Sequence, residues 1–85
     1  EHRGHKSQST TEDFLNTYQK YPSAKNVIIS LGSNDNKESI KLIPTLRTKF
    51  SSNVIWALPA KEHHMQRQYI IDFAYKIKDA YVELP

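Results

Sequence analysis

The sequence predicts an α/β fold built on a parallel sheet, and three observations lead to this prediction. The run Val27-Ile28-Ile29 is apolar and β-branched, which is typical of a strand buried on both faces, as parallel strands usually are. A second apolar run follows at residues 53–58. Apolar residues at helical spacing fill the segments between such runs, and this alternation indicates βαβ units with right-handed crossovers.

Three helices are predicted from the apolar spacing. The first is capped by Thr10 or Thr11, and the acidic residues that follow suit its first turn because the helix dipole favours negative charge there. It ends at Pro22. Pro44 lies inside the second pattern, where it either kinks the helix or opens its main part as a first-turn proline. The apolar residues of the three helices occupy the ranges 14–21, 40–50 and 65–77.

Three strands are predicted at Asn26–Leu31, Asn53–Leu58 and Tyr81–Leu84. The first is apolar throughout and suits the middle of a sheet, because edge strands are normally protected by charge or proline. No strand precedes it in these 85 residues to pair with it. We therefore expect residues 1–85 to form one partial domain, whose missing strands lie in an upstream segment or on another chain. Trp56, in the middle of the second strand, is predicted to lie in the core with a partner for its N–H.

Composition narrows the class of protein. Hydrophobic residues make up 38 % of the chain and charged residues 25 %, which fits a globular domain and not a disordered one. The net charge of +3 is spread along the chain, so we expect no nucleic-acid partner. The absence of cysteine excludes disulfides and thiolate metal sites. No apolar run approaches the length of a membrane span, and no residue pattern calls for a cofactor.

The corner Gly32-Ser33-Asn34-Asp35 follows the first predicted strand directly. In open α/β sheets, ligands bind just beyond the carboxyl ends of the strands, so these side chains are expected at the position of the ligand-binding or active site. A plain turn is the alternative interpretation, because glycine, serine, asparagine and aspartate all favour turns.

This corner, in its setting, resembles the third conserved block of the SGNH (GDSL-like) hydrolases, a family of serine esterases and lipases. Residues 4–11 look like the second block of that family, and residues 54–60 look like its next strand with a proline-containing turn. The resemblance spans nearly the whole chain. It implies a three-layer α/β/α, flavodoxin-like parallel sheet that is incomplete in this chain.

The resemblance also implies roles for particular residues. Asn34 would donate from its amide to the oxyanion of an ester undergoing hydrolysis, beside a backbone N–H of Gly4 or Ser7. Gly32, Ser33 and Asp35 would support the loop, Asp35 by accepting hydrogen bonds.

Two blocks of the family are missing from the chain. There is no Gly-Asp-Ser for the nucleophile, and the chain ends at Pro85, before the Asp-x-x-His block of the base could appear. We therefore expect the chain to be inactive alone and to act on an acyl ester only when completed. The alternative is an inactive SGNH-like structural or interaction module in a larger assembly. A flavodoxin-like signalling domain is a weaker third possibility, because the acidic cluster such domains carry after their first strand is absent.

The four histidines do not suggest a metal site. His63 and His64 are adjacent and point in different directions on any regular element, and His2 and His5 lie in the polar N-terminal segment. No metal ligand is therefore predicted. His63 or His64, in the loop that follows the second strand, remains an alternative source of a catalytic base.

Overall fold

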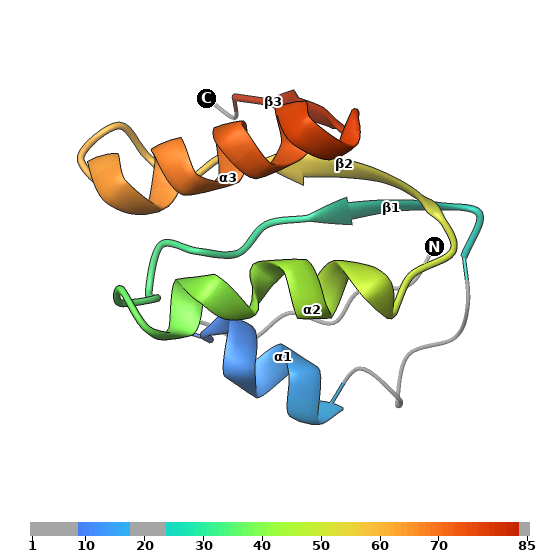
Figure 1. The fold of residues 1–85 in the computed structure, drawn as a ribbon, viewed down its shortest axis with the longest axis horizontal. Coiled ribbons are helices and arrows are strands. Elements are labelled where there is room, and N and C mark those ends of the chain that lie inside the picture. Colours follow the sequence, from blue (N-terminus) through green and yellow to red (C-terminus); the bar gives the residue numbers. More distant parts are fainter. Residues whose placement is uncertain (1–8, 18–23, 84–85) are drawn as a thin grey trace.

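The computed structural model describes residues 9–17 and 24–83 and has the predicted α/β architecture (Figure 1). Its three strands form one parallel sheet in the order β1-β2-β3. An α/β fold with a parallel sheet that is incomplete in this chain is thus confirmed. The elements are α1 (Thr11–Thr17), β1 (Asn26–Ile29), the 3₁₀ helix η2 (Ser39–Leu42), α2 (Ile43–Thr48), β2 (Asn53–Ala57), α3 (His64–Ile77) and β3 (Ala80–Val82).

A reciprocal capping box starts α1. The backbone N–H of Thr10 donates to Asp13 Oδ2 at 2.9 Å, and the N–H of Asp13 donates to Thr10 Oγ1 at 3.3 Å. Thr10 is therefore the cap, and the side chain of Thr11 is free to bond elsewhere. The predicted end of this helix at Pro22 lies outside the described residues.

The structure around Pro44 shows whether this proline kinks the second helix or begins its main part. Asn36 Oδ1 accepts the N–H groups of Glu38 and Ser39 at 2.9 and 2.8 Å, which starts the 3₁₀ helix η2. A new α-helix begins at Ile43, with Pro44 in its first turn. Proline is favoured there because its missing N–H would have no intrahelical partner. The first-turn interpretation is confirmed.

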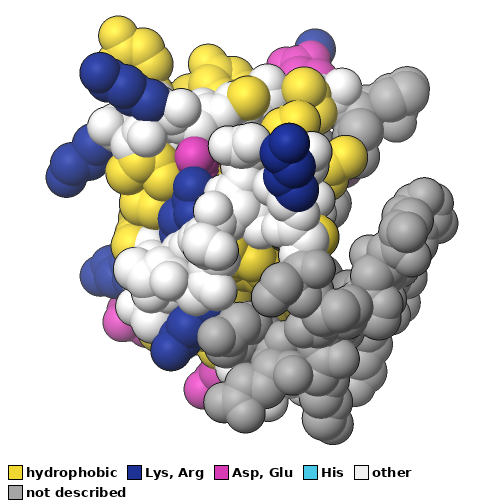
Figure 2. Space-filling model, turned by 90° about the vertical axis from the view of Figure 1, so that its right-hand side faces the viewer, with side chains coloured by type: hydrophobic (Ala, Val, Ile, Leu, Met, Phe, Trp, Pro, Cys, Tyr) yellow, Lys and Arg dark blue, Asp and Glu magenta, His cyan; other side chains and the backbone are white. Residues whose placement is uncertain are grey.

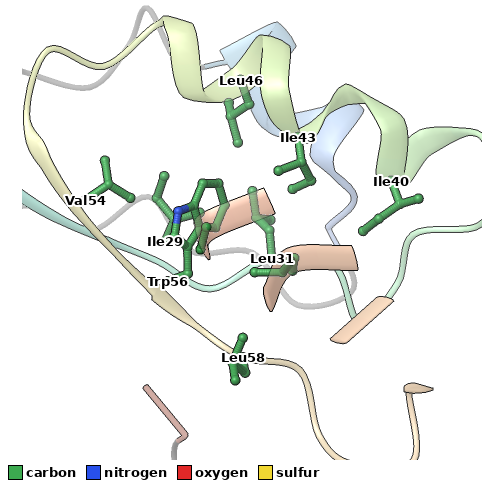
Figure 3. Close-up of a cluster of buried hydrophobic side chains, with 10 residues drawn as sticks. Ile29, Leu31, Ile40, Ile43, Leu46, Val54, Trp56 and Leu58 are labelled. Atoms are coloured by element: carbon green, nitrogen blue, oxygen red, sulfur yellow. The ribbon is translucent and has the colours of Figure 1, made fainter. Parts of the chain in front are cut away.

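Both α2 and α3 pack on the same face of the sheet. Side chains from both helices and from β1 and β2 belong to one buried cluster, and Figure 3 shows α2 side chains pointing towards Trp56 and Ile29. Two successive right-handed crossovers in one direction produce this one-sided arrangement. The cluster consists of Ile29, Leu31, Ile40, Ile43, Leu46, Val54, Trp56, Leu58, Ile70 and Ala74.

The opposite face of the sheet is open around Ile28 in the described part of the chain, although Ala57 on the same face is buried. Ile28 is 69 % exposed and Val82 is 42 % exposed, and the register places Ile28 beside Ile55. Helix α1 packs against η2 and α2 and does not cover this face (Figure 1). The prediction that the first strand is buried on both faces is therefore wrong for the described residues. There β1 is an edge strand, as expected if its neighbouring strands lie outside this chain. A β-branched run favours a strand, but burial depends on covering elements that this segment does not supply.

Trp56 is fully buried and confirms its predicted place in the core. Its ring meets that of Phe73 edge to face, with centroids 5.9 Å apart. Its indole N–H donates to Asp79 Oδ2 at 2.9 Å. Arg47 Nε donates to the same oxygen at 2.7 Å, and Arg47 Nη2 donates to Asp79 Oδ1 at 3.1 Å. One carboxylate thus joins α2, β2 and the start of β3, and bidentate pairs of this kind are strong.

The Asp79 carboxylate should make the stability of the fold depend on pH. Desolvation by burial acts to raise its pKa, but hydrogen bonds from Arg47 and Trp56 and the charge of Arg47 outweigh this, so the pKa is lowered. A carboxyl whose pKa is lower in the folded state stabilises the fold above its unfolded pKa. That contribution is lost as pH falls through the folded pKa.

We therefore expect urea denaturation midpoints that are flat from neutral pH to about pH 5 and that fall below about pH 4. In an Asp79→Asn variant the part of this fall that is due to Asp79 should disappear. Midpoints of the two proteins that decrease in parallel between pH 5 and pH 2 would show that Asp79 is not the responsible group.

Candidate functional site

The corner after β1 is a closed turn. The N–H of Asp35 donates to the carbonyl oxygen of Gly32 at 3.0 Å, which places Ser33 and Asn34 at the two central positions. The backbone conformation at Gly32 favours glycine, and a larger residue would also displace the end of the Ile70 side chain. The φ of 110° at Gly32 is one that other residues rarely adopt, and a Cβ would lie 2.8 Å from Cδ1 of Ile70. The turn is therefore pressed directly against α3.

Asp35 anchors this turn to the start of α1. Its side chain is buried, and Oδ1 accepts the backbone N–H of Thr11 at 3.0 Å while Oδ2 accepts Thr11 Oγ1 at 2.7 Å. The position suits a carboxylate because the N–H groups in the first turn of a helix have no intrahelical acceptor. Asp35 accepts the hydrogen bonds expected of it, and its backbone carbonyl accepts a third, from Gln66 Nε2 at 3.0 Å.

Asn34 is exposed at the tip of the turn. Its Nδ2 donates to the carbonyl oxygen of Ser9 at 3.3 Å. Because a carboxamide NH₂ carries two hydrogens, one remains for another acceptor. The turn thus presents a neutral donor from a backbone that is held on several sides.

The segment before α1 lies next to this donor, since Ser9 contacts Asn34 and Thr11 contacts Asp35. The two positions predicted for the second donor, Gly4 and Ser7, lie outside the described residues.

The first turns of α3 connect the carboxyl ends of all three strands. Gln66 bonds to the corner after β1. Arg67 Nη1 donates to the carbonyl oxygen of Pro59, just after β2, at 3.1 Å. Arg67 also forms an ion pair with Glu83, just after β3. The edge of the sheet where α/β folds bind ligands is therefore organised by two adjacent side chains of one helix.

Among the described residues, the histidines do not form a cluster with other possible metal ligands. His64, which the sequence placed in a loop, begins α3, and His63 precedes it without making a side-chain cap. No group of three or more histidine, aspartate or glutamate side chains in residues 9–17 and 24–83 is placed to hold a metal ion. His2 and His5 lie outside the described residues, and the alternative of a base at His63 or His64 stays a prediction.

Other surface features bear on the classes of partner. On the face shown in Figure 2, lysine and arginine side chains are scattered among apolar and uncharged groups and do not form a stripe of the kind that nucleic-acid-binding domains use. Among the helices of the described segments, none has the length and apolarity needed to cross a bilayer.

Sequence reasoning missed Gln66 altogether, and it considered Thr11 as a possible helix cap and as part of the segment 4–11 but not as a partner of Asp35. Gln66 is 31 positions from its partner Asp35, and Thr11 is 24 positions from it. No local pattern signals such contacts.

No protein-family model matches the chain, and no curated protein or solved structure is significantly similar to it.

Proposed function

We propose that this chain is the central part of an SGNH-type serine esterase and that Asn34 donates a hydrogen bond to the oxyanion during ester hydrolysis. One observation carries the proposal. An exposed amide stands at the carboxyl end of a parallel strand, on a turn fixed by Gly32, Thr11 and Gln66. Acyl transfer develops negative charge on a carbonyl oxygen, and donors held in advance at that point lower the barrier.

The neutral amide of Asn34 suits this role because it donates without depending on pH. The donor must also be held in place, because an amide that has to reorient during the reaction loses much of its stabilising effect on the transition state. Asp35 provides that rigidity through its bonds to Thr11 and Gln66.

The sheet topology supports an incomplete domain. A row of parallel strands whose helices all lie on one face corresponds to half of a doubly wound sheet. In such sheets the strand order reverses at one point, and the ligand binds in the crevice there. The free edge of β1 is where the second half would begin, and the corner at Asn34 lies at the end of that edge. A missing strand paired there, from an upstream segment or from another chain, would carry the nucleophile.

A second candidate is an interaction module without catalysis. It is favoured by the exposed Ile28 on the open face and by the lack of a Gly-Asp-Ser block in the sequence. Such a module would use the same edge and face for assembly, with no ester substrate.

Assays on two proteins separate the candidates. The 85-residue chain alone should not hydrolyse a short-chain p-nitrophenyl ester, whereas the full-length protein encoded around it should do so. A fluorophosphonate should abolish the activity and label a serine outside these residues. An inert full-length protein would favour the interaction module, and serine-dependent turnover by the short chain would refute the assignment of a missing nucleophile.

Ile28 tests the missing half of the sheet. Because it is 69 % exposed, Ile28→Lys should change the free energy of unfolding of the short chain by no more than about 0.5 kcal/mol. In the full-length protein the same lysine would be buried without a partner and should destabilise it by several kcal/mol. Urea denaturation of both proteins measures the two effects.

Tyr75→Lys is the matched control, because Tyr75 is exposed on α3, on the other side of the sheet. It should have little effect in either protein. Equal effects of Ile28→Lys in the short and full-length proteins would argue against a covering element.

A further inference from the structure

The side chain of Gln66 does not cap its own helix. It is the third residue of α3, a position from which glutamine commonly bonds back to the N–H of the residue that caps the helix. That residue is His63, whose N–H already donates to the carbonyl oxygen of Ala60 at 2.9 Å. The amide of Gln66 instead reaches out of the helix to Asp35.

The bond from Gln66 acts on the residue that follows Asn34. The N–H of Asp35 donates to the carbonyl oxygen of Gly32, its carboxylate accepts hydrogen bonds from Thr11, and its backbone carbonyl accepts one from Gln66. Asn34 lies between these fixed points, and its amide reaches Ser9, only two residues before Thr11. Gly32 would still pack against Ile70, but removing the Gln66 bond would free the Asp35 end of the turn from α3 and let the Asn34 amide move relative to Ser9.

We infer that Gln66 is a positioning residue for the Asn34 donor, acting through the carbonyl of Asp35. This inference rests on the proposed function in one respect, which is that Asn34 donates to an oxygen of the substrate. The coupling between Gln66 and Asn34 is a property of the short chain and can be measured without substrate.

The test is NMR spectroscopy of the ¹⁵N-labelled 85-residue chain, with the side-chain NH₂ of Asn34 as the reporter. Gln66→Met removes the amide and keeps a side chain of similar length. The two Asn34 protons should then shift towards the values of a free asparagine, and their exchange with water should rise several-fold. Gln66→Lys, which restores a donor, should recover part of the original signature.

Gln68→Met is the matched control. Gln68 lies on the same helix, and its amide donates to Asp72 Oδ1 at 2.8 Å on an exposed surface. This substitution should leave the Asn34 signals unchanged. A merely structural role for Gln66 would lower stability without moving the Asn34 protons selectively.

The inference is overturned if Gln66→Met folds, as judged by the indole signal of the buried Trp56, and leaves the Asn34 shifts and exchange as they were. Should Gln66→Met fail to fold, Gln66→Asn gives the same comparison, because its amide is one methylene too short to reach Asp35. Absence of esterase activity in the full-length protein would count against the proposed function alone, since the NMR measurement involves no turnover.

Discussion

Replacement of Asn34 by alanine is expected to lower kcat for ester hydrolysis by the full-length protein about 10²–10³-fold, or roughly 3–4 kcal/mol in the barrier, with little change in KM. The reason is that the amide would bind charge that exists only in the transition state. Asn34→Asp should be at least as damaging, because it replaces the donor with an acceptor that repels the oxyanion. Steady-state kinetics on a soluble ester measures both variants.

Asn16→Ala is the control for the loss of an exposed asparagine, because Asn16 lies on the surface of α1. It should leave kcat unchanged. Full activity in Asn34→Ala, with the fold intact, would remove Asn34 from the mechanism and leave the corner as a structural turn.

Replacement of Asp79 by alanine is expected to destabilise the short chain by about 2–4 kcal/mol. The side chain of Asp79 is only 9 % exposed. Its loss would leave the Trp56 N–H without its acceptor and the Arg47 guanidinium with only the carbonyl oxygen of Phe50. Small domains are stable by only about 5–10 kcal/mol, so this change takes a large share of the total. Urea denaturation followed by the fluorescence of Trp56 measures it.

Asp72→Ala is the matched control for this prediction. Asp72 lies on the exposed side of α3 and accepts a bond from Gln68 one helical turn earlier. Such surface pairs contribute little, so the free energy of unfolding should change by less than about 0.5 kcal/mol. Similar losses in the Asp72 and Asp79 variants would show that the cluster around Trp56 is not a principal stabilising contact.

Local patterns in the sequence were sufficient for the type and order of the elements. Where both bounds of a predicted element fall within the described residues, apolar spacing located it to within a few residues, because each periodicity follows from the geometry of a single element. The buried position of Trp56 followed from its place in the middle of a strand. The turn at Gly32 followed from the glycine that ends the first apolar run.

The exposure of β1 could not be obtained in this way. The lack of a preceding strand predicted that β1 would have one unpaired edge within this chain, but the composition of the run around Ile28 did not predict that one of its faces would be exposed. An apolar composition indicates that a strand can be buried without cost. Whether it is buried depends on which elements cover it, and both crossovers place their helices on the other face.

The amino-acid order alone was enough to predict an α/β fold with a polar corner at the end of its first strand, since each of these features is encoded within a dozen neighbouring residues. The partners of that corner and of the core emerged only with the folded chain. Thr11 and Gln66 meet Asp35, and Arg47 and Trp56 meet Asp79, across 23 to 32 positions of sequence. Contacts over such distances are selected by the packing of whole elements against each other, and no segment of the chain contains the information separately.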